Sequence, residues 1–173
     1  LPNGGSISVP DTIANIVHQT SHIYHHFVAD GVGMRQVLDY YMLIKKAKQE
    51  HTDFDAVSKI LKALHLLAMS RAVIYLIEKI LGLPQGEMPW KPDTGYGKLL
   101  LDTMIKGGNF GMYGGNFIIG NLKTLPAMCK RAKMYLLNLR YLPHDPLLAA
   151  TCVVRVINGF IKKTKQYFKG ELK

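Results

Sequence analysis

Three histidines spaced four residues apart, His18, His22 and His26, are the side chains of this chain best suited to chemistry. On an α-helix this spacing would gather the three imidazoles in one column. Two histidines one turn apart can bind zinc, but a catalytic zinc site needs a third ligand and a general base, and no glutamate accompanies the spacing. Three interpretations stay open: a metal site, a polar or nucleotide-facing contact surface, and histidines with a structural role.

Arg35 and Asp39 are also separated by one helical turn. An exposed ion pair between them would contribute about 0.3–0.5 kcal/mol. Alternatively, Arg35 contacts a phosphate or another domain, because it follows the glycine-containing turn 30–33 at the start of a predicted helix. The planar guanidinium and the free amides of a helix N-terminus both suit an anion. Asp39 could orient Arg35 in either case.

A glycine-rich stretch at Gly107–Gly111 contains another candidate, Asn109. The stretch lacks the GxxxxGK[ST] pattern of a phosphate-binding loop and follows no strand. It predicts a tight turn between helices, in which Asn109 could cap a helix or bond the backbone. The candidates for substrate or domain contact are therefore His22, His26, Arg35, Asp39 and Asn109. No residue is assigned a catalytic or metal-binding role.

The elements that must position these residues are predicted to be helices. Apolar residues recur three and four positions apart, and no segment alternates with a period of two. We expect an all-α fold, a compact array of six to eight helices without a substantial sheet. The predicted helices span 11–29, 34–49, 54–64, 66–81, 96–106 and 146–168, with a helical segment over 117–141 interrupted at Pro126.

Residues that begin and end helices support these spans. Asp11, Asp53 and Asp145 are expected to cap helix N-termini, and Gly82 is expected to end the fourth helix. Whether the third and fourth helices are continuous near His65 is left open. The second helix is predicted to bury an apolar face, made up of Met34, Val37, Leu38, Tyr41 and Met42.

The domain organisation is predicted to be simple, with an irregular lead-in over residues 1–10 and one helical domain over 11–173. The charge is uneven. Residues 1–116 hold 11 Lys/Arg and 10 Asp/Glu, whereas residues 117–173 hold 11 and 2, a balance of +9. The basic C-terminal helices could face nucleic acid, an anionic lipid surface, a phosphorylated substrate or an acidic domain, or they could simply be solvated.

The compartment is predicted to be the cytoplasm. The first ten residues carry no basic n-region, and no apolar run reaches the length of a membrane span. Cys129 and Cys152 lack a CxxC or ligand-like spacing and suit buried thiols in a reducing compartment, with a disulfide between neighbouring helices as the alternative.

Three features together resemble a family of bacterial nucleotidyltransferase-like proteins. The first is His22-x3-His26-Phe followed by the run GVGMRQ over 31–36 and by Asp39, with Met34 where the family more often has Leu. The second is the GGNFG motif at 107–111. The third is the overall order of a Val-Pro entry, a helical middle and a basic helical end. The resemblance spans roughly residues 9–170.

The resemblance implies that this chain is the helical C-terminal region of such a protein. In the family, an N-terminal α/β domain carries a Gly-Ser turn and carboxylates that bind Mg²⁺ and a nucleoside triphosphate, because metal ions must neutralise the charge of the transferring phosphoryl group. Gly5-Ser6 is present here, but no Asp-x-Asp follows it. The Asp-x-Asp at Asp53–Asp55 opens a helix, where capping explains it.

Three functional hypotheses follow. The chain is expected to supply scaffold or substrate contacts to a nucleotidyltransferase domain in the same polypeptide, to hold no cofactor itself and to be inactive alone. The alternative is a stand-alone helical module that binds nucleic acid or a phosphorylated ligand through its basic face. Of these two ligands nucleic acid is the less favoured, because no recognisable reading helix or aromatic platform accompanies the basic residues. The third is a helical enzyme with a histidine metal site.

Overall fold

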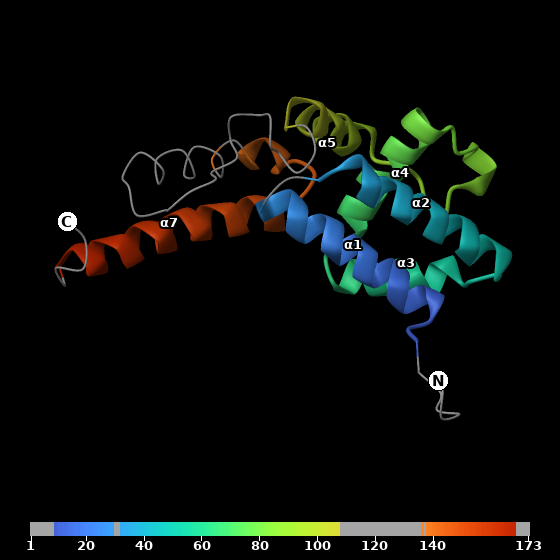
Figure 1. Cartoon of the computed structure of the whole chain (residues 1–173), viewed down its shortest axis with the longest axis horizontal. Coiled ribbons are helices and arrows are strands. Elements are labelled where there is room, and N and C mark those ends of the chain that lie inside the picture. The colour runs from blue at the N-terminus through green and yellow to red at the C-terminus, as the bar shows by residue number, and fades with distance from the viewer. Residues whose placement is uncertain (1–8, 30–31, 108–135, 137, 169–173) are drawn as a thin grey trace, which may run out of the picture.

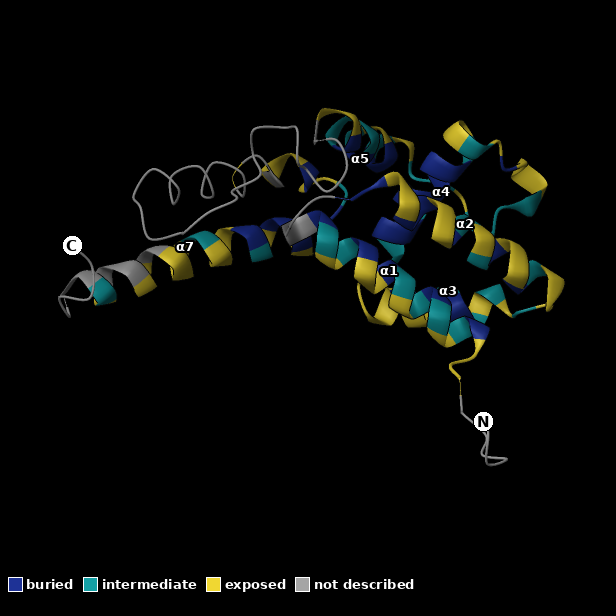
Figure 2. Ribbon diagram, in the orientation of Figure 1, coloured by how far each residue is buried: buried dark blue, intermediate teal, exposed yellow. Residues whose placement is uncertain are grey.

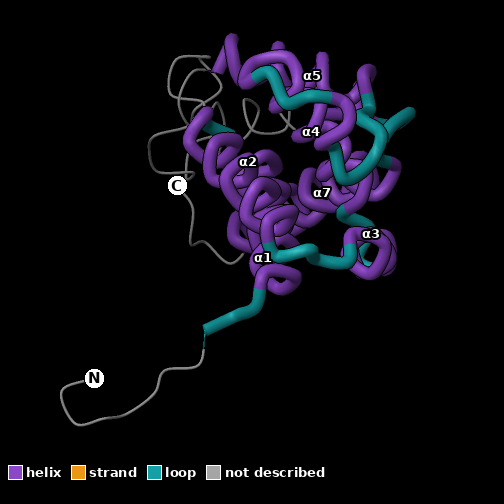
Figure 3. The backbone as a smooth tube through the Cα atoms, turned by 90° about the vertical axis from the view of Figure 1, so that its right-hand side faces the viewer, coloured by secondary structure: helices purple, strands orange, loops and turns teal. Residues whose placement is uncertain are grey.

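Helices make up all the regular structure of the described chain, and the part that the structure describes contains no strand (Figures 1 and 3). The computed structural model describes residues 9–29, 32–107, 136 and 138–168. The α-helices are α1 (Thr12–Ala29), α2 (Met34–Gln49), α3 (Phe54–Ala63), α4 (Leu67–Leu81), α5 (Thr94–Gly107) and α7 (Pro146–Phe168), with 3₁₀ turns η1 (Gln85–Glu87) and η3 (Asn138–Tyr141). The predicted all-α class is confirmed. Most of the segment predicted over 117–141 lies outside the described residues.

Carboxylates begin three of these helices as predicted. The Asp11 Oδ1 accepts a hydrogen bond from the backbone N–H of Ala14 at 2.7 Å. The Asp53 Oδ1 accepts from the amides of Asp55 and Ala56 at 2.9 and 3.0 Å, and Asp145 Oδ1 accepts from Leu148 at 2.9 Å. Each bond satisfies an amide that has no partner within its own helix.

The structure settles whether the third and fourth helices are continuous, and it moves the predicted start of the fifth. α3 and α4 are separate helices, because the chain reverses at His65, which adopts a left-handed φ of 57°. α5 begins at Thr94, two residues earlier than predicted, because the Asp93 Oδ1 caps the amide of Tyr96 at 2.9 Å. Gly82 ends α4 with a φ of 69°, as predicted for a C-terminal glycine.

The helix α2 lies antiparallel to α1, and its buried face is only partly the predicted one: Val37 is fully buried and Tyr41 packs partly against the core. Met34, Leu38 and Met42 are exposed, with Met42 63% accessible, whereas Tyr40 and Ile44 are fully buried. The Tyr40 hydroxyl makes a 2.7 Å hydrogen bond with Ser70 on α4 and lies within hydrogen-bond distance, 3.3 Å, of the Thr20 hydroxyl on α1. Because both bonds satisfy the hydroxyl, tyrosine can occupy the core, and the three exposed residues turn to solvent.

The core is centred on α4, which packs against α1, α2, α3 and α5. Every residue from Ala72 to Ile77 is buried. α5 approaches α4 closely at Gly97, where an added Cβ would overlap the Tyr75 side chain. Glycine therefore permits this contact. The loop between the two helices is held by Arg71, whose Nε donates to the carbonyl of Lys91 at 2.8 Å.

The helix α7 packs its first turns on this body and then reaches away from the other described helices (Figure 1). Leu148, Ala149 and Cys152 are buried. Beyond Val156 the described residues of α7 are mostly exposed, as Figure 2 shows. Among the described residues, none of the helices has both the length and the hydropathy needed to cross a bilayer.

Candidate functional site

The predicted histidine column is present on α1. The His18 and His22 rings stack with centroids 6.1 Å apart, and the His22 and His26 rings meet edge to face at 4.4 Å. His25 also contacts His26, at 5.9 Å. The residues on the opposite side of α1, such as Ile16 and Ile23, are fully buried, so the column follows the outer side of the helix.

This crowding of imidazoles affects His22 most clearly. Partial burial, together with the neighbouring His26, His18 and His25, lowers the pKa of His22 below its ordinary value of 6.5. Burial removes water that would solvate an imidazolium, and each charged neighbour repels it. His22 therefore favours the neutral form, in which one ring nitrogen accepts a hydrogen bond and the other donates one.

Arg35 and Asp39 lie on the exposed side of α2, at its beginning. The structure gives no ion pair between them within the described residues, although they are one turn apart. The N-terminus of α2 is organised by Gln36, whose Oε1 accepts the backbone N–H of Gly33 at 3.0 Å. The Arg35 guanidinium is thus a solvent-facing cation in the first turn of a helix whose dipole also favours anions.

One hydrogen bond brings the histidine side of α1 next to the start of α2. The Gln19 Nε2 donates to the backbone carbonyl of Gln36 at 3.4 Å. His22 and His26 follow Gln19 by three and seven residues, so they continue along the same side of α1. His22, His26, Arg35 and Asp39 lie within seven residues of the two partners of this hydrogen bond, and they are defined here as the α1–α2 edge. It can offer hydrogen bonds and one permanent positive charge to a ligand or a second domain.

The carboxylates of the described residues do not assemble a metal centre. No group of three or more His, Cys, Asp or Glu side chains within the described part of the chain is arranged to hold a metal ion. Asp53 uses its Oδ1 to cap α3, as expected for the Asp-x-Asp at this position. The fifth candidate, Asn109, lies outside the described residues, as do Gly108–Gly111 of its motif.

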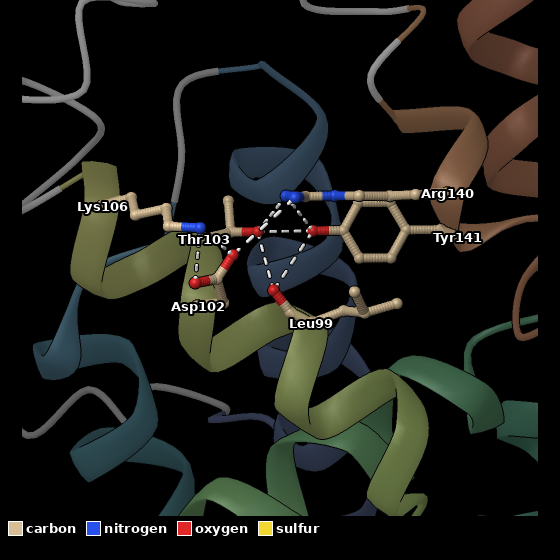
Figure 4. A network of polar contacts seen from close by, with 6 residues as sticks. All are labelled: Leu99, Asp102, Thr103, Lys106, Arg140 and Tyr141. Carbon is tan, nitrogen blue, oxygen red and sulfur yellow. Dashed lines mark hydrogen bonds and ion pairs between the residues drawn. The ribbon is translucent and has the colours of Figure 1, made fainter.

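A polar network that the sequence did not indicate joins α5 to η3 (Figure 4). The Arg140 guanidinium donates to the Thr103 hydroxyl at 2.5 Å and to the Tyr141 hydroxyl at 2.9 Å. Thr103 donates to the carbonyl of Leu99 at 2.8 Å and lies 2.5 Å from the Tyr141 hydroxyl. Since Leu99 O can only accept and Arg140 can only donate, Tyr141 donates to Thr103. Asp102 adds charge, 2.9 Å from Lys106 and 3.9 Å from Arg140.

A buried carboxyl group lies at the start of α7, close to the same junction. Burial raises the pKa of Asp145, while its hydrogen bonds from the Leu148 amide and the Tyr96 hydroxyl act in the opposite direction. Burial, and then the Asp145 charge, also raise the pKa of Tyr24 and of Tyr96. The neighbouring His144 ring stacks on Tyr96 and its Nδ1 is 3.4 Å from Asp93 Oδ1. These groups lie where α5 meets the start of α7. Asp93 and Asp145 are both explained by their roles as helix caps.

Comparison with known proteins gives one match. Residues 2–82 match the model of a family described as uncharacterised nucleotidyltransferase. The match supports the resemblance inferred from the sequence over these residues. It covers α1 to α4, including the α1–α2 edge, and it ends before the glycine-rich motif and the basic end. No curated protein and no solved structure matches the chain.

Proposed function

We propose that this chain is the helical C-terminal region of a bacterial, cytoplasmic nucleotidyltransferase, and that it holds substrate or the catalytic domain at the α1–α2 edge. The observation that carries the proposal is Arg35, an exposed cation in the first turn of α2, beside the histidine column and inside the segment matched by the family. Arginine at a helix N-terminus suits a phosphate or a carboxylate of a neighbouring domain.

The positions of the carboxylates indicate which part of the full polypeptide would bind the metal. Nucleotidyl transfer requires acidic residues to bind Mg²⁺ and the nucleoside triphosphate. We assign that role to an N-terminal domain in the same polypeptide, because the Asp-x-Asp of this chain caps α3. The chain alone is then inactive, and its contribution is to orient the substrate or stabilise the catalytic domain.

The test uses the full polypeptide encoded by the gene. Arg35→Ala should raise KM for the phosphorylated substrate at least tenfold, because a charged hydrogen bond is lost, while leaving the fold intact. Lys45→Ala is the matched control, since Lys45 is an exposed cation on the same helix, over the Tyr41 ring rather than at the helix start. An open reading frame without an in-frame nucleotidyltransferase domain, or equal KM values for both variants, would refute the proposal.

A second candidate is a stand-alone module that binds nucleic acid or a phosphorylated ligand. The exposed Arg155, Lys162 and Lys165 of α7 favour it. Such a module should retard an oligonucleotide at low salt, with an affinity that falls steeply as salt is added. A titration without retardation at low ionic strength would remove nucleic acid from consideration.

A further inference from the structure

The helix α7 carries two apolar faces, of which the body covers one. Leu148, Ala149 and Cys152 are buried, and Val156 packs partly against the core. A second set of apolar residues is exposed, from 37% at Val153 to 53% at Val154. The members of this set are Leu147, Val153, Val154, Ile157 and Ile161.

The exposed residues form one continuous stripe, defined here as the α7 stripe. Leu147, Val154 and Ile161 are seven residues apart, which returns them to nearly the same side of the helix after two turns. Val153 and Ile157 lie between them on that side. From Leu147 to Ile161 the stripe extends roughly 20 Å along the axis. A stripe of this length is well beyond the single exposed apolar side chains of ordinary surfaces.

The charge of α7 identifies what can cover the stripe. The sequence of Pro146–Phe168 contains no Asp or Glu, and its Arg155, Lys162 and Lys165 are exposed. The complementary surface must therefore be both apolar and anionic. A second copy of this helix would oppose like charges. Nucleic acid would satisfy the cations but would leave the α7 stripe in water.

We propose that α7 binds the surface of an anionic membrane, lying in the interface with the α7 stripe among the acyl chains. Interfacial helices combine an apolar face with a basic polar face. Lysine stems can lie along the apolar boundary while their ammonium groups reach the lipid phosphates. α7 projects away from the other described helices (Figure 1), as an interfacial helix on a flat surface would. This inference does not depend on the nucleotidyltransferase proposal.

Flotation of the full chain with lipid vesicles tests the proposal. The chain should float with phosphatidylcholine vesicles containing a quarter phosphatidylglycerol, remain behind with pure phosphatidylcholine, and dissociate as salt is raised. Lys162→Gln with Lys165→Gln should weaken binding about fivefold per charge. Ile157→Ser with Ile161→Ser should weaken it at least tenfold, because two apolar anchors are lost.

Matched controls carry the same substitutions on the helical body. Leu38→Ser with Met42→Ser removes two exposed apolar side chains of α2, and Lys59→Gln with Lys62→Gln removes two exposed charges of α3. These controls should bind vesicles as the wild type does, and circular dichroism should give the same helicity for all five proteins. Absence of flotation at low salt, equal loss in the control variants, or tighter binding to DNA that the isoleucine variants leave unchanged would overturn the proposal.

Discussion

At the scale of single residues, the buried Tyr40 hydroxyl shows how polar groups enter this core. It shares a 2.7 Å hydrogen bond with the fully buried Ser70. Burial raises the pKa of Tyr40 to about 12, so it stays protonated at ordinary pH. Tyr40→Phe should lower the free energy of unfolding by about 1–3 kcal/mol, because the fully buried Ser70 hydroxyl loses its partner.

Urea denaturation measures this effect. Tyr41→Phe is the control, since Tyr41 is only half-buried and its ring lies beneath Lys45. Equal midpoints for the Tyr40→Phe variant and the wild type would mean that the hydroxyl contributes nothing net.

His22 should make stability depend on pH. Its pKa in the folded state is below the ordinary 6.5, so the folded chain binds fewer protons than the unfolded chain. The contribution of His22 to the free energy of unfolding is therefore fully present above pH 6.5. It falls as the pH passes below 6.5 and levels off below the folded-state pKa. His22→Gln should flatten this part of the curve, measured by urea midpoints across the range.

His51→Asn provides the control for that titration, because His51 is exposed and has a φ of 53°, which asparagine tolerates. This variant should keep the wild-type slope. A His22→Gln variant with an undiminished slope would assign the pH dependence to other groups.

At the scale of elements, capping decides where the helices begin. Asp53→Ala should cost about 1 kcal/mol, because two amides at the start of α3 lose their acceptor. Asp55→Ala should cost less, about 0.5 kcal/mol, since Asp55 contributes mainly through the helix dipole. Thermal unfolding with and without Mg²⁺ checks both. A Mg²⁺-dependent stabilisation lost in both variants would favour a metal site over capping.

The caps also explain how much could be read from the sequence. Asp11, Asp53 and Asp145 act on amides two or three residues away, so local sequence was sufficient to place the starts of α1, α3 and α7. The prediction for α2 was correct for Val37 but wrong for Met34, Leu38 and Met42, because apolar character alone does not tell which side of a helix faces the core. Tyr40 reaches the core through Thr20 and Ser70, which lie 20 and 30 residues away.

The candidate site likewise has a part that local sequence predicts and a part that it does not. The column of His22 and His26 follows from helical spacing alone, and the structure confirms that the rings adjoin. The Thr103–Arg140 contact joins residues 37 positions apart, and no local pattern signals it. Periodicity predicts which residues share a helix, whereas contacts between helices require the packed fold.

At the scale of the whole molecule, the network of Figure 4 connects the helical body to its basic end. Thr103→Val keeps the shape of the side chain but removes the hydroxyl that Arg140 and Tyr141 share. We expect amide protection near the start of α7 to fall by about 1–3 kcal/mol, while α4 keeps its protection. Hydrogen exchange read by mass spectrometry resolves the two regions.

Thr151→Val is the matched control, because the Thr151 hydroxyl bonds only the nearby Leu148 carbonyl, at 2.8 Å, among the interactions described. It should leave protection nearly unchanged. Uniform loss of protection in the Thr103→Val variant would indicate that the network stabilises the entire fold rather than the junction.

The position of Trp90 gives the molecule an internal optical reporter. It is the sole tryptophan of the chain, half-buried in the loop between α4 and α5, with its ring centroid 6.0 Å from that of Phe54. Its fluorescence spectrum should therefore shift to longer wavelength when the loop opens and water reaches the indole. Events confined to the outer part of α7 should leave the emission unchanged. Fluorescence and far-ultraviolet dichroism can thus separate melting of the body from changes at the basic end in one sample.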